Sequence, residues 1–319
     1  MICNSILVAA LALVSLLARV GAQAPAGQVP YTFYQLQLQD QFVKNQQNIR
    51  GKPYESYFKK DLYVYPEMIE PGRTSIDCPT QALKPDLSDI NKLLIPANQT
   101  LDIENGWCAY DDGSGYVASR THFPGSTGAM ASWWLWWHSA ETARYTLWHP
   151  WAHVSVSSSY AAKFSDPTLN NTQKLFGSVH KVSEIIGDAP EDIEIHWFPA
   201  SHFGIDEAKF AEVGGVATGC GELYSGGVKI GDMVHLFFQK ADASGIELRS
   251  RYFLGNKFSV NVPLLGDLDI DLLANTFGIK KLTIGRHLAS NQFHHDQQEF
   301  THLASFLPQI YKDFGNNST

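Results

Sequence analysis

The second half of the chain reads as a series of strands that ends in one long helix. Period-two alternation or β-rich composition runs through residues 174–187, 192–199, 228–241 and 246–255, and Lys240–Gly245 has the composition of a hairpin turn. A helical stretch follows from about Arg286 to Asp313. Strands followed by one long helix favour an antiparallel sheet wrapped round that helix, an α+β arrangement. The space between them would be a natural small-molecule cavity.

Ahead of these strands lie two further predicted elements. Residues 106–123 predict two strands joined by an Asp-Asp-Gly-Ser-Gly turn. Residues 128–150 are long, mostly apolar and free of internal proline, and they predict one buried helix that Pro150 ends.

Residues 23 to about 105 differ in composition: they are rich in glutamine and are interrupted by prolines. One helix is predicted here, over Asp86–Ile95, with Asp86 or Ser88 as its cap. We therefore expect an irregular and helical N-terminal region over residues 23–105 and a catalytic body over residues 106–319.

The first 22 residues predict a secretory signal peptide. Ile6 to Ala18 is a short apolar run, and Val20 and Ala22 place small residues at the −3 and −1 positions of a cleavage site after Ala22. The run is too short for a comfortable membrane span, and no later segment is long and apolar enough to cross a bilayer. The expected location is outside the cell or in the lumen of the secretory pathway.

Secretion agrees with the glycosylation sequons and with the cysteines. Asn98, Asn170, Asn316 and Asn317 each begin an Asn-X-Ser/Thr pattern. After cleavage Cys78, Cys108 and Cys220 remain, which permits one disulfide and one free thiol. We favour Cys78–Cys108, because both lie in the loop-rich N-terminal third. Three cysteines argue against a thiolate zinc site.

The composition narrows the class of partner. The net charge is −8 without a Lys/Arg cluster, which argues against nucleic acid as a partner. Eight Trp and eighteen Phe fit a core around an apolar pocket, although a plain aromatic core gives the same count. The motifs G-x-S-x-G, H-E-x-x-H and G-x-G-x-x-G are absent from the sequence.

The final helix carries a candidate metal-binding pattern, HHDQQEF, at residues 294–300. Residues four apart share a helix face, so His295 points with Glu299, whereas His294 pairs with Gln298. His302 lies on roughly the face of His295. Zinc accepts imidazole nitrogen and carboxylate oxygen, but the spacing alone also fits a solvated helix face.

Further ligands would have to come from elsewhere in the chain. HPWAHVSV offers His149 and His153, and the predicted strand HKVSEII offers His180 and Glu184 on one face. A lone glutamate among apolar strand residues is costly to bury unless it is paired, although an exposed face would also explain it. We expect His138 to be a core or pocket histidine. His196 and His202 flank a turn, and we expect both to be structural.

Several of these segments, taken in order, resemble a known family. WWLWWH…RYTLWHPWAH, VSEIIG, RSRYFLG and HHDQQEFTHLASFLPQIY are similar to segments of the diacetylphloroglucinol hydrolase family, which includes phloretin hydrolases. The resemblance covers roughly Asn105 to Asp313. It implies a helix-grip (Bet v 1-like) domain with an additional N-terminal region, and zinc (Zn²⁺) held by two histidines and two glutamates.

The resemblance also implies a role for each matching residue. The metal ligands would be His153, Glu184, His295 and Glu299. Tyr145 would be a pocket phenol that hydrogen-bonds the substrate, Glu184 a ligand that doubles as a base, and the remaining pocket candidates are His235 and Tyr252. The signal peptide, the sequons and the doubled histidine depart from the family pattern, and they suggest a fungal-type secretory relative.

The expected activity is zinc-dependent hydrolysis of the C–C bond between an acyl group and a polyhydroxylated aromatic ring. Two alternatives stay open at this point. One is a dehydratase, cyclase or hetero-Diels–Alder catalyst of secondary metabolism on the same scaffold, which needs no metal-bound nucleophile. The other is a carrier for a hydrophobic aromatic ligand. The expected partner is a small phenolic molecule, and a homodimer is also left open.

Overall fold

The computed structural model describes residues 24–31, 36–187, 190–262 and 266–315. The predicted signal peptide and the sequons at Asn316 and Asn317 lie outside these ranges. Within them, every helix is too short or too polar to cross a bilayer. The side chains of Asn98 and Asn170, the other two sequon residues, are exposed.

The main body is one antiparallel sheet. Its strands lie in the order β3 (Gly106–Ala109), β4 (Gly115–Pro124), β10 (Gly245–Val262), β9 (Val228–Gln239), β8 (Gly215–Ser225), β7 (Pro190–Phe198), β6 (Val179–Ile185) and β5 (His153–Ser158). β11 (Gly266–Asp269) pairs with the far end of β10. A separate ribbon joins β1 (Val29–Pro30) to β2 (Tyr63–Val64).

Helices fill the connections and cover the sheet. The α-helices are α2 (Leu36–Ile49), α3 (Ile69–Arg73), α4 (Cys78–Gln81), α5 (Gly128–Trp137), α6 (Thr142–Trp148), α7 (Asn171–Leu175), α8 (Glu207–Glu212), α9 (Asp271–Thr276), α10 (Ile279–Thr283) and α11 (Gly285–Phe314). Short 3₁₀ turns are η1 (Glu55–Tyr57), η2 (Pro66–Met68), η3 (Ile90–Leu93), η4 (His138–Ala140), η5 (Ala161–Lys163) and η6 (Ala200–Phe203).

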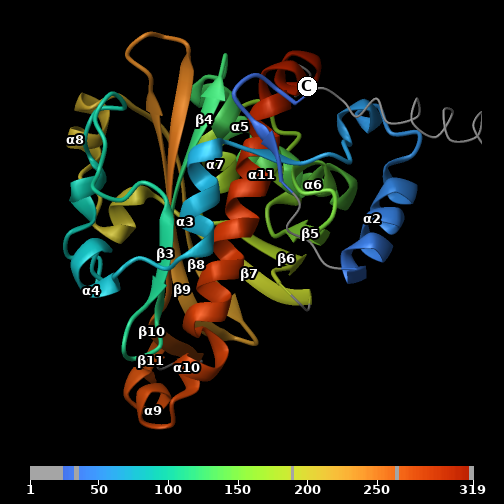
Figure 1. The fold of residues 1–319 in the computed structure, drawn as a ribbon. Coiled ribbons are helices and arrows are strands. Elements are labelled where there is room, and N and C mark those ends of the chain that lie inside the picture. Colours follow the sequence, from blue (N-terminus) through green and yellow to red (C-terminus); the bar gives the residue numbers. More distant parts are fainter. Residues whose placement is uncertain (1–23, 32–35, 188–189, 263–265, 316–319) are drawn as a thin grey trace, which may run out of the picture.

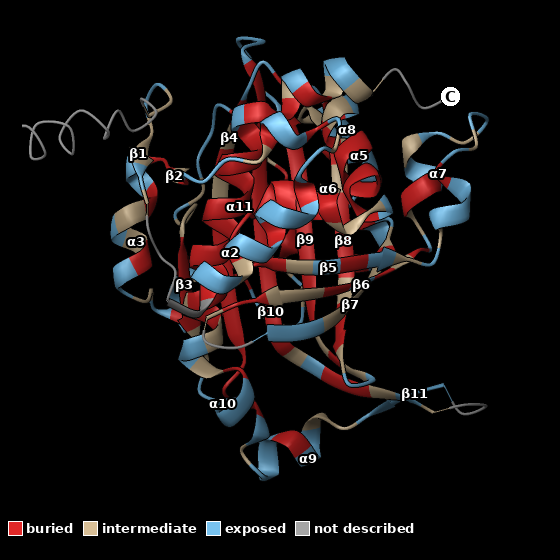
Figure 2. Ribbon diagram, turned by 90° about the vertical axis from the view of Figure 1, so that its right-hand side faces the viewer, coloured by how far each residue is buried: buried red, intermediate tan, exposed pale blue. Residues whose placement is uncertain are grey.

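The long helix α11 lies across the concave side of the sheet (Figure 1). Its apolar residues Phe293, Phe300 and Leu307 are completely buried in the main hydrophobic core. Polar residues of α11 are also buried, because the N-terminal region covers the side away from the sheet: Gln297 Nε2 donates to the carbonyl of Met68 at 3.1 Å. Figure 2 shows the central strands and the middle of α11 as the most buried parts. The predicted α+β, helix-grip arrangement is confirmed.

The single helix predicted over Gly128–Pro150 is wrong, because α5 and α6 are separated by η4 and an extended residue. Glu141 has φ −157° and ψ 135°, and its carboxylate accepts hydrogen bonds from Lys52 and Tyr54 of the N-terminal region. A contact with a distant segment therefore holds the break. Nothing in the local apolar pattern signals it.

The predicted helix over Asp86–Ile95 is also wrong, because only η3 forms there. Leu87 adopts a positive φ of 62°, which a helix does not tolerate. Arg249, buried on the sheet, donates to the carbonyls of Leu93, Ile95, Pro96 and Gln99 at 2.8–3.3 Å. These carbonyls are directed at a guanidinium instead of at helical N–H groups.

The N-terminal region is attached to the sheet by covalent and apolar contacts. The predicted disulfide Cys78–Cys108 is confirmed, and it joins α4 to β3. Cys220 is free and buried in β8. The apolar side chains of Ile90 and Leu93 belong to the same hydrophobic cluster as residues of β8, β9 and β10. The predicted boundary at residue 106 is the first residue of β3.

Candidate metal-binding active site

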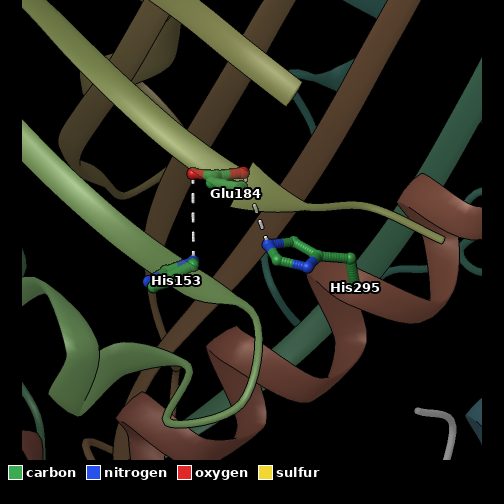
Figure 3. Close-up of side chains that lie close together, drawn as sticks. All are labelled: His153, Glu184 and His295. Atoms are coloured by element: carbon green, nitrogen blue, oxygen red, sulfur yellow. Dashed lines mark ion pairs between the residues drawn. The ribbon is translucent and has the colours of Figure 1, made fainter. Parts of the chain in front are cut away.

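Two neighbouring strands and one helix bring the four predicted ligands together. His153 is the first residue of β5, and Glu184 is its registered partner on β6. His295 and Glu299 lie one turn apart on α11. Figure 3 shows the Glu184 carboxylate between the two imidazoles, with one oxygen facing each ring.

The imidazole nitrogens and carboxylate oxygens of these four side chains lie close together. His153 Nε2 lies 3.8 Å from Glu184 Oε1 and 3.3 Å from Glu299 Oε2. His295 Nε2 lies 3.6 Å from Glu184 Oε2 and 3.6 Å from Glu299 Oε2. The ligand atoms of His153, Glu184 and His295 all fall within 4.8 Å of one another, so this group could hold a metal ion.

The geometry of both histidines fits that role, and so does the tautomer of His153. His153 Nδ1 lies 3.0 Å from the carbonyl of Tyr145, a contact that requires an N–H at Nδ1 and leaves Nε2 as a bare acceptor. The Nε2 atoms of His153 and His295 are both buried without a hydrogen-bond partner. A buried polar atom without a partner is costly, and a cation between the two rings would remove that cost.

The pKa shifts of the clustered side chains also favour a bound cation. Burial raises the pKa of Glu184 to about 8, and burial together with the Glu184 and Asp296 carboxylates raises the pKa of Glu299 well above its usual value. Burial and neighbouring histidines lower the pKa of His153 far below 6.5. The site thus disfavours every charged form of its own residues, whereas a bound cation would stabilise ionised carboxylates and neutral imidazoles.

Tyr145 is the predicted pocket phenol closest to the cluster. Its hydroxyl donates a hydrogen bond to Glu184 Oε1. Its ring stacks on His153, with the ring centroids 3.9 Å apart and the planes 9° from parallel. Tyr145 therefore contacts both a carboxylate and an imidazole of the site.

A cavity opens beside the cluster, between the sheet and α11. Its lining contains five predicted site residues, Tyr145, Glu184, His235, Tyr252 and Glu299. Tyr252 Oη lies 3.5 Å from His235 Nε2, and burial lowers the pKa of His235 to about 3, so this imidazole is neutral.

The same cavity is lined by polar atoms that lack partners. His180 is buried with neither ring nitrogen hydrogen-bonded, and Trp197 Nε1 and His235 Nδ1 are buried without partners as well. Unsatisfied buried polar groups around one cavity favour a ligand that carries several oxygen atoms. No role was predicted for Trp197, because nothing in the alternating strand around it distinguishes it from a core residue.

The remaining histidines fall outside the cluster. His149 stacks flat on His295 at 4.9 Å, accepts from the Ala152 N–H and contacts Gln298, so it supports the ligand ring from behind. His302 Nδ1 lies 3.0 Å from the carbonyl of Trp148. His294 points away from the site and hydrogen-bonds Tyr31.

Three histidines were expected to be structural or pocket residues. His138 lines the cavity, and its Nδ1 lies 2.7 Å from the carbonyl of Trp134. His196 and His202 contact the carboxylates of Glu194 and Glu222, on the other side of the sheet from α11. Two glutamines of α11 also belong to the site: Gln298 contacts His149, and Gln292 lines the cavity. Neither was predicted, because a glutamine on a polar helix is not distinctive in the sequence.

The fold and the site together define a helix-grip protein in which a buried cluster, able to hold a metal ion, faces an internal cavity. The sequence profile of the DAPG hydrolase PhiG domain matches residues 83–312. A 2,4-diacetylphloroglucinol hydrolase of Pseudomonas protegens is 34% identical over 293 residues, which cover 90% of this chain and 92% of that protein. The chain therefore belongs to the DAPG hydrolase family.

Two other proteins are similar over part of the chain. A phloretin hydrolase of Eubacterium ramulus is 26% identical over 205 residues, covering 63% of this chain and 69% of that protein. The crystal structure of Ara h 8.0201 matches with a TM-score of 0.28 and 12% identity, over 57% of this chain and 99% of that one. The Pseudomonas protegens and Eubacterium ramulus relatives are both named as hydrolases, as the resemblance implied.

Proposed function

We propose that the protein is a zinc-dependent hydrolase that cleaves the C–C bond between an acyl group and a polyhydroxylated aromatic ring. The observation that carries the proposal is the convergence of two buried, unpartnered Nε2 atoms, of His153 and His295, on the carboxylates of Glu184 and Glu299. The family relatives are named for substrates of this acylphloroglucinol type.

Zinc suits the donor set, because it prefers imidazole nitrogen and carboxylate oxygen. His153, His295, Glu184 and Glu299 would hold it. When bound, zinc supplies Lewis acidity, which polarises an acyl carbonyl and lowers the pKa of water to near 7. Four protein ligands normally form a closed site, so we assign Glu184 as the ligand that moves, since it is the most exposed of the four, at 13%.

The chain's own residues would bind and orient the ring. Tyr145, Tyr252 and His235 line the cavity and can hydrogen-bond the phenolic oxygens, where negative charge develops as the ring carbon leaves. His235 is neutral and can donate from one ring nitrogen while it accepts on the other. Glu184 would accept the proton from the attacking water.

The reaction balances with water as the only co-substrate. The ring first takes its keto form, which makes the ring carbon a stabilised leaving group. The C–C bond to the acyl carbon then breaks while the hydroxyl of water bonds to that carbon. The proton that Glu184 takes from water passes to the ring carbon, and the products are a carboxylic acid and the deacylated phenol.

We further propose that the protein travels the secretory pathway and carries glycans. The exposed side chains of Asn98 and Asn170 support this proposal, as does a disulfide, since disulfides persist in oxidising compartments. Expression in a eukaryotic host, followed by enzymatic deglycosylation, should shift the mass of the secreted chain. A chain that stays unmodified in the cytosol would contradict it.

Zinc analysis combined with product identification tests the main proposal. The purified chain should contain stoichiometric zinc and release the free carboxylic acid from an acylphloroglucinol. A cyclised or dehydrated product would instead indicate a secondary-metabolite cyclase on the same scaffold. Tight binding without any turnover would indicate a carrier.

A further inference from the structure

A second, larger cavity lies directly beyond the active-site cavity. It has a volume of about 790 Å³ and lies between the ends of β7 to β10, the helices α9 and α10, and the first turns of α11. These helices lie at the lower end of the molecule in Figure 1. The two cavities share four lining residues, Ile186, Ile193, Leu223 and Gln292. The outer cavity therefore adjoins the active-site cavity along these four residues.

One face of α11 connects the two cavities. Leu288 lines the outer cavity, Gln292 lines both, and His295 and Glu299 belong to the ligand cluster. These residues are spaced by four, three and four positions, so they follow one another along a single side of the helix. A molecule that extends from the cluster along this face reaches the outer cavity.

The outer cavity is apolar, whereas the inner one presents unpartnered polar groups. Most of its lining is aliphatic or aromatic, including Leu254, Phe258 and Ile284, which are at most 5% exposed. Its rim is apolar too: Leu273 is 57% exposed and Phe277 is 71% exposed. Surface residues of this kind beside a cavity mark a binding site for an apolar group.

The inner cavity is much smaller than the outer one, at about 50 Å³ against about 790 Å³. A substrate whose ring binds beside Glu184 therefore finds room for a long substituent only past Ile193 and Leu223, in the outer cavity.

We infer that the outer cavity is the subsite for an extended apolar acyl chain, so that the preferred substrates are phenolic ketones with acyl groups longer than acetyl. This inference rests on the proposed function for the identity of the reacting bond. The oxygen-bearing ring binds among the polar groups of the inner cavity, and the hydrocarbon tail lies among Leu254, Phe258 and Ile284.

The test uses the full-length, metal-loaded chain and acylphloroglucinols with acetyl, butanoyl, hexanoyl and octanoyl groups. The kcat/KM should rise by about fourfold for each added methylene until the cavity is filled, mainly through KM. Leu273→Glu places a charge at the rim and should lower the preference for octanoyl over acetyl by about tenfold. Leu282→Glu is the matched control, because Leu282 is 85% exposed on the neighbouring helix and does not line the cavity.

Binding of alkylphloroglucinols, which lack the scissile ketone, separates this inference from the proposed function. Their affinity, measured by calorimetry, should increase with chain length in the wild type and less so in Leu273→Glu. If all ketones are cleaved with equal kcat/KM, the acyl subsite is wrong and the hydrolase stands. If no ketone is cleaved, the proposed hydrolase function is wrong. The chain-length dependence of alkylphloroglucinol binding then tests the apolar subsite independently.

Discussion

His153 and Glu184 face each other across the β5–β6 ladder, and their Nε2 and Oε1 atoms lie 3.8 Å apart. A strand pair fixes this spacing through its backbone hydrogen bonds, so two of the four proposed ligands are positioned by the sheet alone. His295 and Glu299 are positioned separately by α11. The site is complete only when the helix packs against the edge of the sheet that β5 and β6 form.

Removing His295 tests the metal site. His295→Ala should abolish stoichiometric zinc binding, measured by elemental analysis of the purified chain, and hydrolysis should be lost with it. Glu299→Gln keeps the volume of the side chain and should weaken zinc binding as well, because it removes a negative charge. His294→Ala is the matched control, since the neighbouring ring faces Tyr31. Equal zinc content in His295→Ala and His294→Ala would disprove the assignment.

Tyr145→Phe separates catalysis from metal binding. The hydroxyl contacts Glu184 but is not one of the four ligands. Its loss should lower kcat by about 10²-fold, as for the removal of one donor to a developing oxyanion, while zinc content stays stoichiometric. Tyr224→Phe is the control, because Tyr224 makes a similar contact with Glu222 away from the cavity. An unchanged kcat would exclude Tyr145 from the reaction.

His149 should act on zinc affinity through His295. The two rings stack with their planes 7° apart, and the Ala152 N–H and Gln298 fix the orientation of His149. His149→Ala should weaken zinc binding by about 10–100-fold, as is typical for residues that orient a ligand. Competition with a chelator measures this change. His149→Phe keeps a flat ring and should recover part of the affinity, which a purely structural role would not predict.

The stability of the metal-free protein should depend on pH in two opposite ways. Buried histidines such as His153 stay neutral in the folded state but bind protons below pH 6.5 when unfolded, so stability rises with pH up to about 6.5. Glu184 ionises near pH 4.5 when unfolded and near pH 8 when folded. Between these values the folded state binds more protons, so this group lowers stability as pH rises.

The two effects combine into a maximum near pH 6.5, above which only the carboxylate contribution acts. Thermal unfolding of the metal-free chain from pH 5 to 8.5 should therefore show the melting temperature falling above about pH 6.5. Zinc should remove that fall, because it stabilises the ionised carboxylate. Glu184→Gln should reduce the fall without zinc, and the contribution of Glu299 should remain. A melting temperature that keeps rising to pH 8 would contradict the prediction.

The Cys78–Cys108 bond should stabilise the attachment of the N-terminal region. It closes a loop with a sequence separation of 30, for which chain entropy gives a stabilisation of about 3.5 kcal/mol. The double variant Cys78→Ser, Cys108→Ser should unfold at correspondingly lower denaturant concentration. Reducing agent should destabilise the wild type and leave the variant unchanged. If reducing agent destabilised the wild type and the variant equally, the lost stability would not come from this disulfide.

Periodicity predicted α11 and the strands of the body, because each has one face that must be buried. The break at Glu141 could not be predicted, since it depends on Lys52 and Tyr54, about 90 residues earlier in the chain. Helical spacing paired His295 with Glu299, but it could not place either beside His153. That placement depends on how α11 crosses the sheet, which here only a family resemblance could supply.

The spacing of these residues along α11 also limits which mutations the site can tolerate. Each residue turns the helix by about 100°, so a one-codon insertion between Gln292 and Glu299 would rotate the two ends of this face apart. The acyl subsite would then no longer lie in line with the ligands, even though every side chain is still present. Insertions and deletions in this stretch should be far less tolerated than most substitutions, whereas the exposed ends of α9 and α10 can vary with the tail of the substrate.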